Sequence, residues 1–280
     1  MVAALPVQSS GVALIAAIAL FLASSVQVVT TERFMDSSPH GWCSVDIRFP
    51  KVTGLKSVAI EHSVNRRLRE PFFRFPEPYM RGVSFANSPD THPSLSGCER
   101  DLAEETKSLP ASHLYLENGH MSTTASTTFR VGHADNGFVS IVGDGFQYAT
   151  PSAHPNDYWW TLNIDATTGR VMKFDDLFYS DATRIGRLRS LIEQSIRKIP
   201  YSSEYELVQS FDAFGNFPDQ IHPLVCAGGV RFFSLFIGHA VAGVTTFVSG
   251  KQLIASGVVK DPLALAVLKE PHRPSDSCGD

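Results

Sequence analysis

The sequence has no excess of positive charge and no long basic run. Its 280 residues include 24 Lys and Arg residues and 28 Asp and Glu residues, so the formal net charge is -4. A protein surface that binds nucleic-acid phosphates needs a concentrated patch of Lys and Arg side chains. We therefore expect no nucleic-acid partner.

Sequence motifs of several enzyme classes are also missing. There is no G-x-S-x-G, which would place a nucleophilic serine on a strand-to-helix turn. There is no H-E-x-x-H, which would hold zinc on one helix, and no glycine-rich loop with a Lys-Ser or Lys-Thr pair for phosphate. The four cysteines form no C-x-x-C pair, so neither a zinc site nor thioredoxin-type chemistry is indicated. We predict no metal and no cofactor, and the sequence favours a binding domain over an enzyme.

Charge is absent from the N-terminal segment, where the first charged side chain is Glu32. The apolar centre of this segment, Gly11–Ala23, has the length of a signal-peptide core and is too short to span a bilayer. Small residues at Ala23–Ser25 offer a cleavage site, whereas Val26–Val29 could lengthen the run into an uncleaved anchor. A buried helix of a cytosolic domain is less favoured, because the segment has no polar face.

We therefore expect residues 1–30 to be a signal peptide or an N-terminal membrane anchor. The protein is then exported and is periplasmic or secreted. It contacts the inner membrane only through this segment, and only if the segment is not cleaved.

The cysteines agree with export. They are widely spaced and even in number: Cys43, Cys98, Cys226 and Cys278. In an exported chain this favours two disulfides, for which three connectivities are possible. We favour Cys43–Cys98 with Cys226–Cys278, because local pairing would fasten each half of the chain separately. Four free buried thiols are the alternative for a cytosolic protein.

The N-terminal half of the sequence predicts strands, turns and two helices. Apolar and polar residues alternate in Trp42–Pro50, which is typical of a half-buried strand. Val52–Glu70 has apolar residues on one helical face, and Pro71 is expected to end that helix. The other expected elements are a short helix at Glu99–Lys107, strands at Leu114–Leu116, Ser126–Val131 and Phe138–Val142, a turn at Asp135–Gly137, and a Gly-Asp-Gly bend at Gly143–Gly145.

A β-hairpin is the clearest element of the second half. Apolar residues alternate in Tyr158–Ile164, Asp165–Gly169 has turn composition, and Arg170–Phe174 returns as the partner strand. The elements expected after it are a helix from Ala182 to Ile199 capped by Asp181, strands at Gly229–Ile237 and Val244–Val248, and a short helix near Lys251–Ala255.

Together these elements predict an α+β fold of two lobes, with mainly antiparallel sheets each covered by a helix. We expect an N-terminal lobe over residues 31–134 and a C-terminal lobe over residues 135–268. A polar tail would follow at residues 269–280.

The order of motifs from the first predicted strand to the last one resembles a bacterial cell-envelope domain. That domain forms the extracellular part of a lysozyme-sensing anti-sigma factor, and it also precedes the catalytic domain of a peptidoglycan deacetylase. Most members have two glycines before an Ala-His pair, where this sequence has Pro151 and Ser152. The resemblance extends from about Cys43 to about Leu268. The residues that carry it are Ala153-His154-Pro155, Asn163, Asp165, Thr168-Gly169 and Asp175-Asp176-Leu177-Phe178.

The resemblance implies a non-catalytic envelope domain that binds a lysozyme-like protein or peptidoglycan. In the two-part relatives the deacetylase chemistry belongs to a separate catalytic domain, so we do not expect it here. The aromatic residues Tyr158 and Trp159, together with His154, are the expected binding residues. Trp160 is expected in the core, because it alternates with Trp159 along the strand.

The candidates for catalysis are His154, Asp157 and His239. Both histidines follow predicted strands in loops of small residues, where an imidazole can meet a ligand. A purely structural role, in which the ring bonds a backbone carbonyl, is the favoured interpretation. The alternative function is a small envelope hydrolase that uses His154 with a nearby carboxylate as general base. A metal site built from these three residues also stays open, because distance in sequence does not give distance in space.

Overall fold

The chain folds into two β-sheets that follow one another in the sequence. The computed structural model describes residues 28–76, 94–95, 97–108, 122–135, 137–150, 156–200, 217–218, 221–234, 245–272 and 278. Of the helices in these residues, none has the length and apolar character that crossing a bilayer requires. The predicted α+β class with mainly antiparallel sheets is confirmed.

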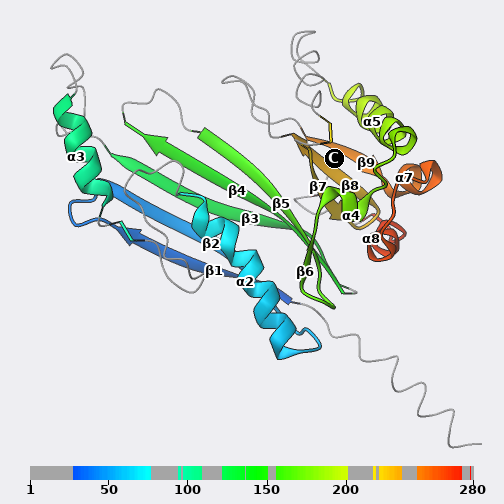
Figure 1. The fold of residues 1–280 in the computed structure, drawn as a ribbon, viewed down its shortest axis with the longest axis horizontal. Helices are drawn as coiled ribbons and strands as arrows, with labels where there is room; N and C mark the ends of the chain where they lie inside the picture. The colour runs from blue at the N-terminus through cyan, green and yellow to red at the C-terminus, as the bar shows by residue number, and fades with distance from the viewer. Residues whose placement is uncertain are drawn as a thin grey trace, which may run out of the picture.

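The larger sheet has six strands in sequence order and forms the elongated part of the molecule (Figure 1). Neighbouring strands are antiparallel except β2 and β3, which are parallel. The strands are β1 (Val28–Ser37), β2 (Cys43–Thr53), β3 (Thr123–Asp135), β4 (Phe138–Ala149), β5 (Asn156–Asp165) and β6 (Arg170–Met172).

Strand β1 was not anticipated from the sequence. It pairs with β2 along its whole length, from Val28 opposite Thr53 to Ser37 opposite Ser44. Its first residues therefore lie within the range 1–30 that was assigned to a leader or anchor. The same sheet continues to Met172, and the expected lobe boundary between residues 134 and 135 falls at the hairpin between β3 and β4.

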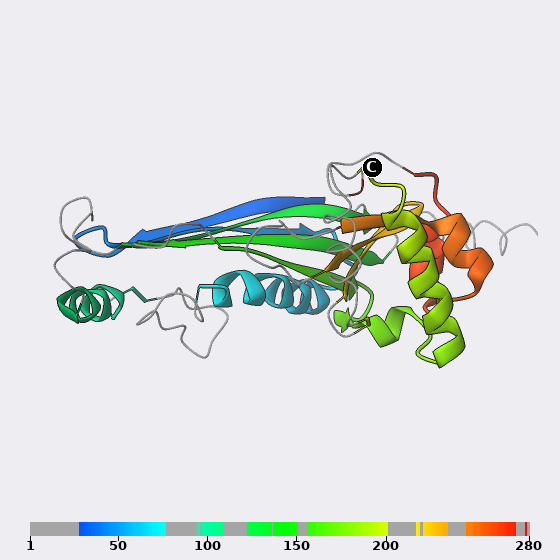
Figure 2. The same cartoon turned by 90° about the horizontal axis from the view of Figure 1, so that it is seen from above.

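Helix α2 (Val58–Arg74) covers one face of this sheet (Figure 2). Pro71 lies inside the helix, so the prediction that it ends the helix is wrong. A proline in a helix interior removes one backbone hydrogen bond and costs about 3 kcal/mol. The next two residues, Phe72 and Phe73, are buried against the sheet. Each burial is worth about 1.5–3 kcal/mol, which offsets the loss and carries the helix one turn further.

The side chain of Asn65 fastens α2 to the sheet. Its carbonyl oxygen accepts a hydrogen bond from the backbone N–H of Val52 (2.7 Å), and its amide group donates to the Val52 carbonyl (2.9 Å). The amide thus satisfies both backbone groups of a buried strand residue, as a neighbouring strand would.

Gly143 and Gly145 lie within the continuous strand β4, so the predicted Gly-Asp-Gly bend is wrong. The reason for glycine here is side-chain packing. A Cβ atom at Gly143 would collide with the ring of Trp160, and one at Gly145 would collide with the ring of Phe75. The two rings pack directly on the backbone of β4 at the two glycines, on the face that α2 covers. Asp144, between the glycines, therefore points to the opposite face.

The β5–β6 hairpin forms as predicted, although β6 is shorter than expected. The Asp165 carboxylate accepts hydrogen bonds from the backbone and hydroxyl of Thr167 and from the hydroxyl of Thr168. Gly169 has φ 75°, which a residue with a side chain adopts at a cost. The predicted strand at Leu114–Leu116 lies outside the described residues.

The smaller sheet has the order β7-β8-β9 and lies with its helices at one end of the large sheet (Figure 2). The predicted cap is confirmed, since Asp181 accepts from the backbone N–H of Arg184 (3.0 Å). Strand β7 and helix α8 were not anticipated. The strands of the smaller sheet and the helices beside it are α4 (Phe174–Leu177), α5 (Ala182–Ile196), β7 (Ile221–Cys226), β8 (Gly229–Ser234), β9 (Thr245–Ser249), α7 (Gly250–Ser256) and α8 (Pro262–Leu268).

Asn163 on β5 joins the two sheets. Its amide group donates to the carbonyl of Pro223 (2.7 Å), and its oxygen accepts from the N–H of Val225 (3.2 Å). Gly132 lets β7 approach β3, because a Cβ atom there would lie 2.9 Å from the Leu224 side chain. The two sheets thus meet on the face of the large sheet that α2 does not cover.

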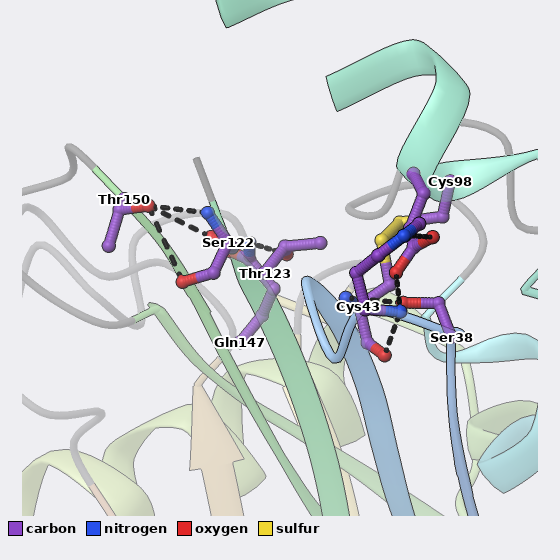
Figure 3. The surroundings of a disulfide bond; sticks show 9 residues. Ser38, Cys43, Cys98, Ser122, Thr123, Gln147 and Thr150 are labelled. Carbon is purple, nitrogen blue, oxygen red and sulfur yellow. Dashed lines mark hydrogen bonds and ion pairs between the residues drawn. A yellow bond between two sulfur atoms is a disulfide. The ribbon is translucent and has the colours of Figure 1, made fainter. Parts of the chain in front are cut away.

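Two disulfides fasten the ends of the structure, with the pairing favoured from the sequence. Cys43–Cys98 joins the start of β2 to helix α3 (Cys98–Ser108), beside the hydroxyl of Ser38 (Figure 3). Cys226–Cys278 joins the end of β7 to the C-terminal tail. Such bonds are typical of an oxidising compartment.

We expect both disulfides to stabilise the fold to a similar extent. Their sequence separations are 55 and 52 residues, and in the chain-entropy model each loop closure is worth about 4 kcal/mol. The double variants Cys43→Ala/Cys98→Ala and Cys226→Ala/Cys278→Ala should each lose about 2–5 kcal/mol of unfolding free energy in urea denaturation. Unchanged stability in either variant would contradict its role as a folding constraint.

We expect Asn163→Ala to destabilise the joint between the sheets by about 2–4 kcal/mol, because it leaves a buried donor and a buried acceptor unpaired. Asn65→Ala removes an equivalent pair of bonds and is the matched control. Only the Asn163 variant should increase the quenching of tryptophan fluorescence by acrylamide, since Trp159 packs on the second sheet. Equal quenching in both variants would contradict the assignment of Asn163 to this joint.

Candidate functional site

A groove lies on the face of the large sheet opposite α2, beside the smaller sheet. We call it the outer groove; its volume is about 320 Å³, at the lower end of the range for small-molecule sites. Four adjacent strands, β2 to β5, contribute to it. Its lining residues are Asp46, Arg48, Ser126, Thr127, Thr128, Asp144, Gly145, Phe146, Asp157 and Trp159.

Strand register brings these residues together from distant parts of the chain. Asp46 lies opposite Ser126, which lies opposite Phe146, which lies opposite Asp157. The neighbouring row places Thr128 opposite Asp144 and Asp144 opposite Trp159. Residues in such rows share one face of a sheet and lie within contact distance of one another. The groove therefore forms only when the four strands β2, β3, β4 and β5 pair in this order.

Two aromatic side chains border the outer groove. The ring of Trp159 is half-buried and meets the edge of Phe233 from the smaller sheet, with ring centroids 5.5 Å apart. Phe146 is 39% exposed. The contact with Phe233 holds Trp159 in place, while Phe146 offers its surface to solvent.

The aspartates of the outer groove differ in their electrostatic environment. Arg33 makes two hydrogen bonds of 2.8 Å to Asp46, and these lower the pKa of that carboxyl. For Asp144, burial raises the pKa, and the ion pair with Arg130 at 3.2 Å only partly opposes this. The negative charge of Asp157 raises the pKa of Asp144 further.

Asp157 and Trp159 are the sequence-predicted residues that lie in the outer groove. Tyr158 and Trp160 point to the α2 side, where their rings pack on Phe75 at 5.5 Å and on Phe72 at 5.0 Å. Tyr158 and Trp159 therefore do not share a surface, because successive residues of a strand point to opposite faces. The core position predicted for Trp160 agrees with this packing.

His154 and His239 lie outside the described residues, so the site predicted around them stays a prediction. Within the described ranges, no three His, Cys, Asp or Glu side chains are placed to hold a metal ion. Sequence reasoning did not select Asp46, Asp144 or Phe146 as site residues. The alternation in β2 places Asp46 on the polar face of that strand. For Asp144, the two neighbouring glycines predicted a bend, so the sequence did not show on which strand face this residue lies.

The fold is similar to two solved structures of bacterial proteins from the DUF3298 family, a domain family of unknown function. One is from Bacteroides fragilis, with a TM-score of 0.61 and 14% identity over 88% of this chain and 98% of that chain. The other is from Pseudomonas aeruginosa, with a TM-score of 0.52 and 15% identity over 88% of this chain and 98% of that chain.

At these identities the likeness establishes the fold alone. It agrees with the expected bacterial domain of unknown function, but it adds no link to the anti-sigma factor or the deacetylase. No protein-family model and no curated protein matches the sequence.

The opposite pKa shifts of Asp144 and Asp46 predict opposite effects of their amide variants. A raised pKa means that the ionised carboxyl opposes folding, whereas a lowered pKa means that it supports folding, and each effect grows as pH rises through about 4. As pH is raised from about 3 to about 7, the unfolding free energy of Asp144→Asn should increase relative to that of the wild-type protein. Over the same change in pH, the unfolding free energy of Asp46→Asn should decrease relative to the wild-type protein. Urea denaturation at both pH values checks this, and a change of the same sign in both variants would contradict it.

Proposed function

We propose that the protein is an exported domain of the cell envelope that binds a peptidoglycan-type glycan in the outer groove. The observation that carries the proposal is the grouping of a half-buried Trp159 and an exposed Phe146 with carboxylates and hydroxyls on one sheet face. Sugars present apolar C–H faces and many hydroxyl groups. A site that binds them therefore needs aromatic surfaces and hydrogen-bonding side chains together.

The aromatic part of the proposed site is formed by Trp159 and Phe146. Trp159 is fixed by its contact with Phe233, so little side-chain entropy is lost when a ligand packs on it. Phe146 is exposed at the same groove. Together they form two apolar surfaces on which sugar rings can pack.

The polar part of the proposed site comes from Asp157, Asp144, Ser126 and Thr128. A carboxylate accepts hydrogen bonds from sugar hydroxyls and from the N–H of an acetamido group. Within the part of the chain that the structure describes, no salt bridge to Asp157 is found, and its side chain is exposed. Asp157 is therefore the carboxylate best placed to meet a ligand.

Export is supported by the two disulfides and by the uncharged segment before Glu32. Disulfides persist in the periplasm and outside the cell, where peptidoglycan is present, and are rare in the cytosol. The resemblance to envelope domains noted above points to the same compartment. A glycan of the cell wall is thus a ligand that the protein would meet there.

A lysozyme-like protein is the other partner that the resemblance implies. The outer groove has a volume of about 320 Å³, which suits a small ligand, whereas protein interfaces bury about 800 Å² on each partner. The small size of the outer groove favours a glycan over a protein as its ligand. A lysozyme is therefore tested as a separate ligand.

A small hydrolase is the second candidate function, and one observation favours it. Burial raises the pKa of Asp144, and a carboxyl with a raised pKa beside a second carboxylate is an arrangement suited to general acid catalysis. Asp157 would then be the second carboxylate. Release of soluble fragments from peptidoglycan by the wild-type protein, lost in Asp144→Asn, would replace the binding proposal with this one.

We expect Trp159→Ala to weaken binding of soluble peptidoglycan fragments by about tenfold or more, which corresponds to about 1.4 kcal/mol, because it removes a fixed stacking surface. Isothermal titration calorimetry measures the change. Phe146→Ala should weaken binding to a smaller extent, since its ring is more exposed.

Tyr179→Ala is the matched control, because Tyr179 is a 36% exposed aromatic residue outside the outer groove. It should bind like the wild-type protein. Equal affinities for the Trp159 and Tyr179 variants would rule out the outer groove as the binding site. Binding to hen-type lysozyme but not to glycan fragments would favour the protein partner instead.

A further inference from the structure

A second, larger cavity, which the proposed function does not use, lies beside the smaller sheet. Its volume is about 730 Å³, and it lies between the end of α5, strands β8 and β9, and the chain at His272. It shares no lining residue with the outer groove. Cavities of this volume are typical of sites for small organic molecules.

The charged side chains that line this cavity are all basic or imidazole groups. Lys198 follows α5, Arg231 lies on β8, and His272 lies in the C-terminal tail. Among the described residues of the lining there is no aspartate or glutamate. Two segments distant in sequence thus bring a cationic side chain each to one cavity, Lys198 and Arg231, which favours a ligand with negative charge.

Arg231 has a defined position in the cavity wall. Its Nη1 atom donates to the hydroxyl of Thr245 on the neighbouring strand (3.0 Å). The side chain is half-buried, so a charge interaction here is screened less than one on the surface. A planar guanidinium held in this way suits a phosphate or carboxylate group.

The rest of the lining is partly apolar. Ile199 and Pro200 contribute from the segment after α5, and Phe247 contributes its ring from β9. The Phe247 ring lies 5.2 Å from that of His272, which places an apolar surface beside the polar end of the tail. A ligand that fills the cavity therefore needs an apolar body as well as an anionic group.

We propose that this cavity binds a small organic anion, in which a phosphate or carboxylate group is attached to an apolar body of about two rings. Arg231 and Lys198 contact the anionic group, and Phe247 packs on the apolar body. The site is independent of glycan binding in the outer groove.

The test measures binding of the probe 1-naphthyl phosphate to the purified protein by isothermal titration calorimetry. We expect saturable one-to-one binding that weakens as salt increases, because charge attraction contributes to it. The uncharged 1-naphthol should bind at least about tenfold more weakly. 1-Naphthoate replaces the phosphate with a carboxylate and shows which anionic group is preferred.

Lys198→Gln and Arg231→Gln should each weaken binding of 1-naphthyl phosphate by about fivefold or more. Lys173→Gln removes an exposed cation outside the cavity and should bind like the wild-type protein. The thermal unfolding midpoint of each variant is measured first. If Arg231→Gln does not fold, Lys198→Gln alone decides, because the Lys198 side chain is exposed.

Three outcomes would overturn the proposal. They are the absence of saturation up to millimolar probe, equal affinities for 1-naphthyl phosphate and 1-naphthol, and unchanged affinity in the Lys198 and Arg231 variants that fold. None of these outcomes depends on glycan binding, so failure here would leave the proposal for the outer groove standing.

Discussion

The position of the smaller sheet depends on one buried amide side chain, that of Asn163. It bonds to two backbone groups of β7 and thereby fixes the distance and register between the two sheets. The contact of Trp159 with Phe233 follows from this placement, and it holds one lining residue of the outer groove, Trp159, in position. A buried amide with both ends satisfied is more specific than apolar packing, because any shift along the strand would leave polar groups unpaired.

Strand β5 serves the core and the candidate site at the same time. Its alternation directs Tyr158 and Trp160 toward α2, and it directs Asp157 and Trp159 toward the outer groove. The two glycines of β4 make room for the rings of Trp160 and Phe75 and leave Asp144 pointing outward. Burial then opposes ionisation of Asp144, so this residue weakens the fold at neutral pH. Such a residue is easier to explain by function than by stability.

The features that depend on neighbouring residues were predictable from the sequence. The Asp165–Gly169 turn, the Asp181 cap and the period-two alternation of β5 each have a local physical cause, and each forms. Pro71 and the Gly143–Gly145 segment were misjudged, because packing against distant aromatic rings outweighs local preference there. The outer groove could not be predicted, since Asp46 and Asp144 meet only through pairing across β3.

The parallel pairing of β2 with β3 has a consequence for the way the sheet assembles. Strands β3 to β6 form a meander of local hairpins, and β1 with β2 forms another, so both pieces can fold from short-range contacts. At the seam between them, only Cys43–Ile47 pairs with Thr123–Thr127. This pairing requires closure of the long connection between β2 and β3, which contains α2 and α3. The outer groove straddles this seam. A ligand bound there would hold the two pieces together, so under the proposed function occupancy of the groove would be thermodynamically coupled to completion of the sheet.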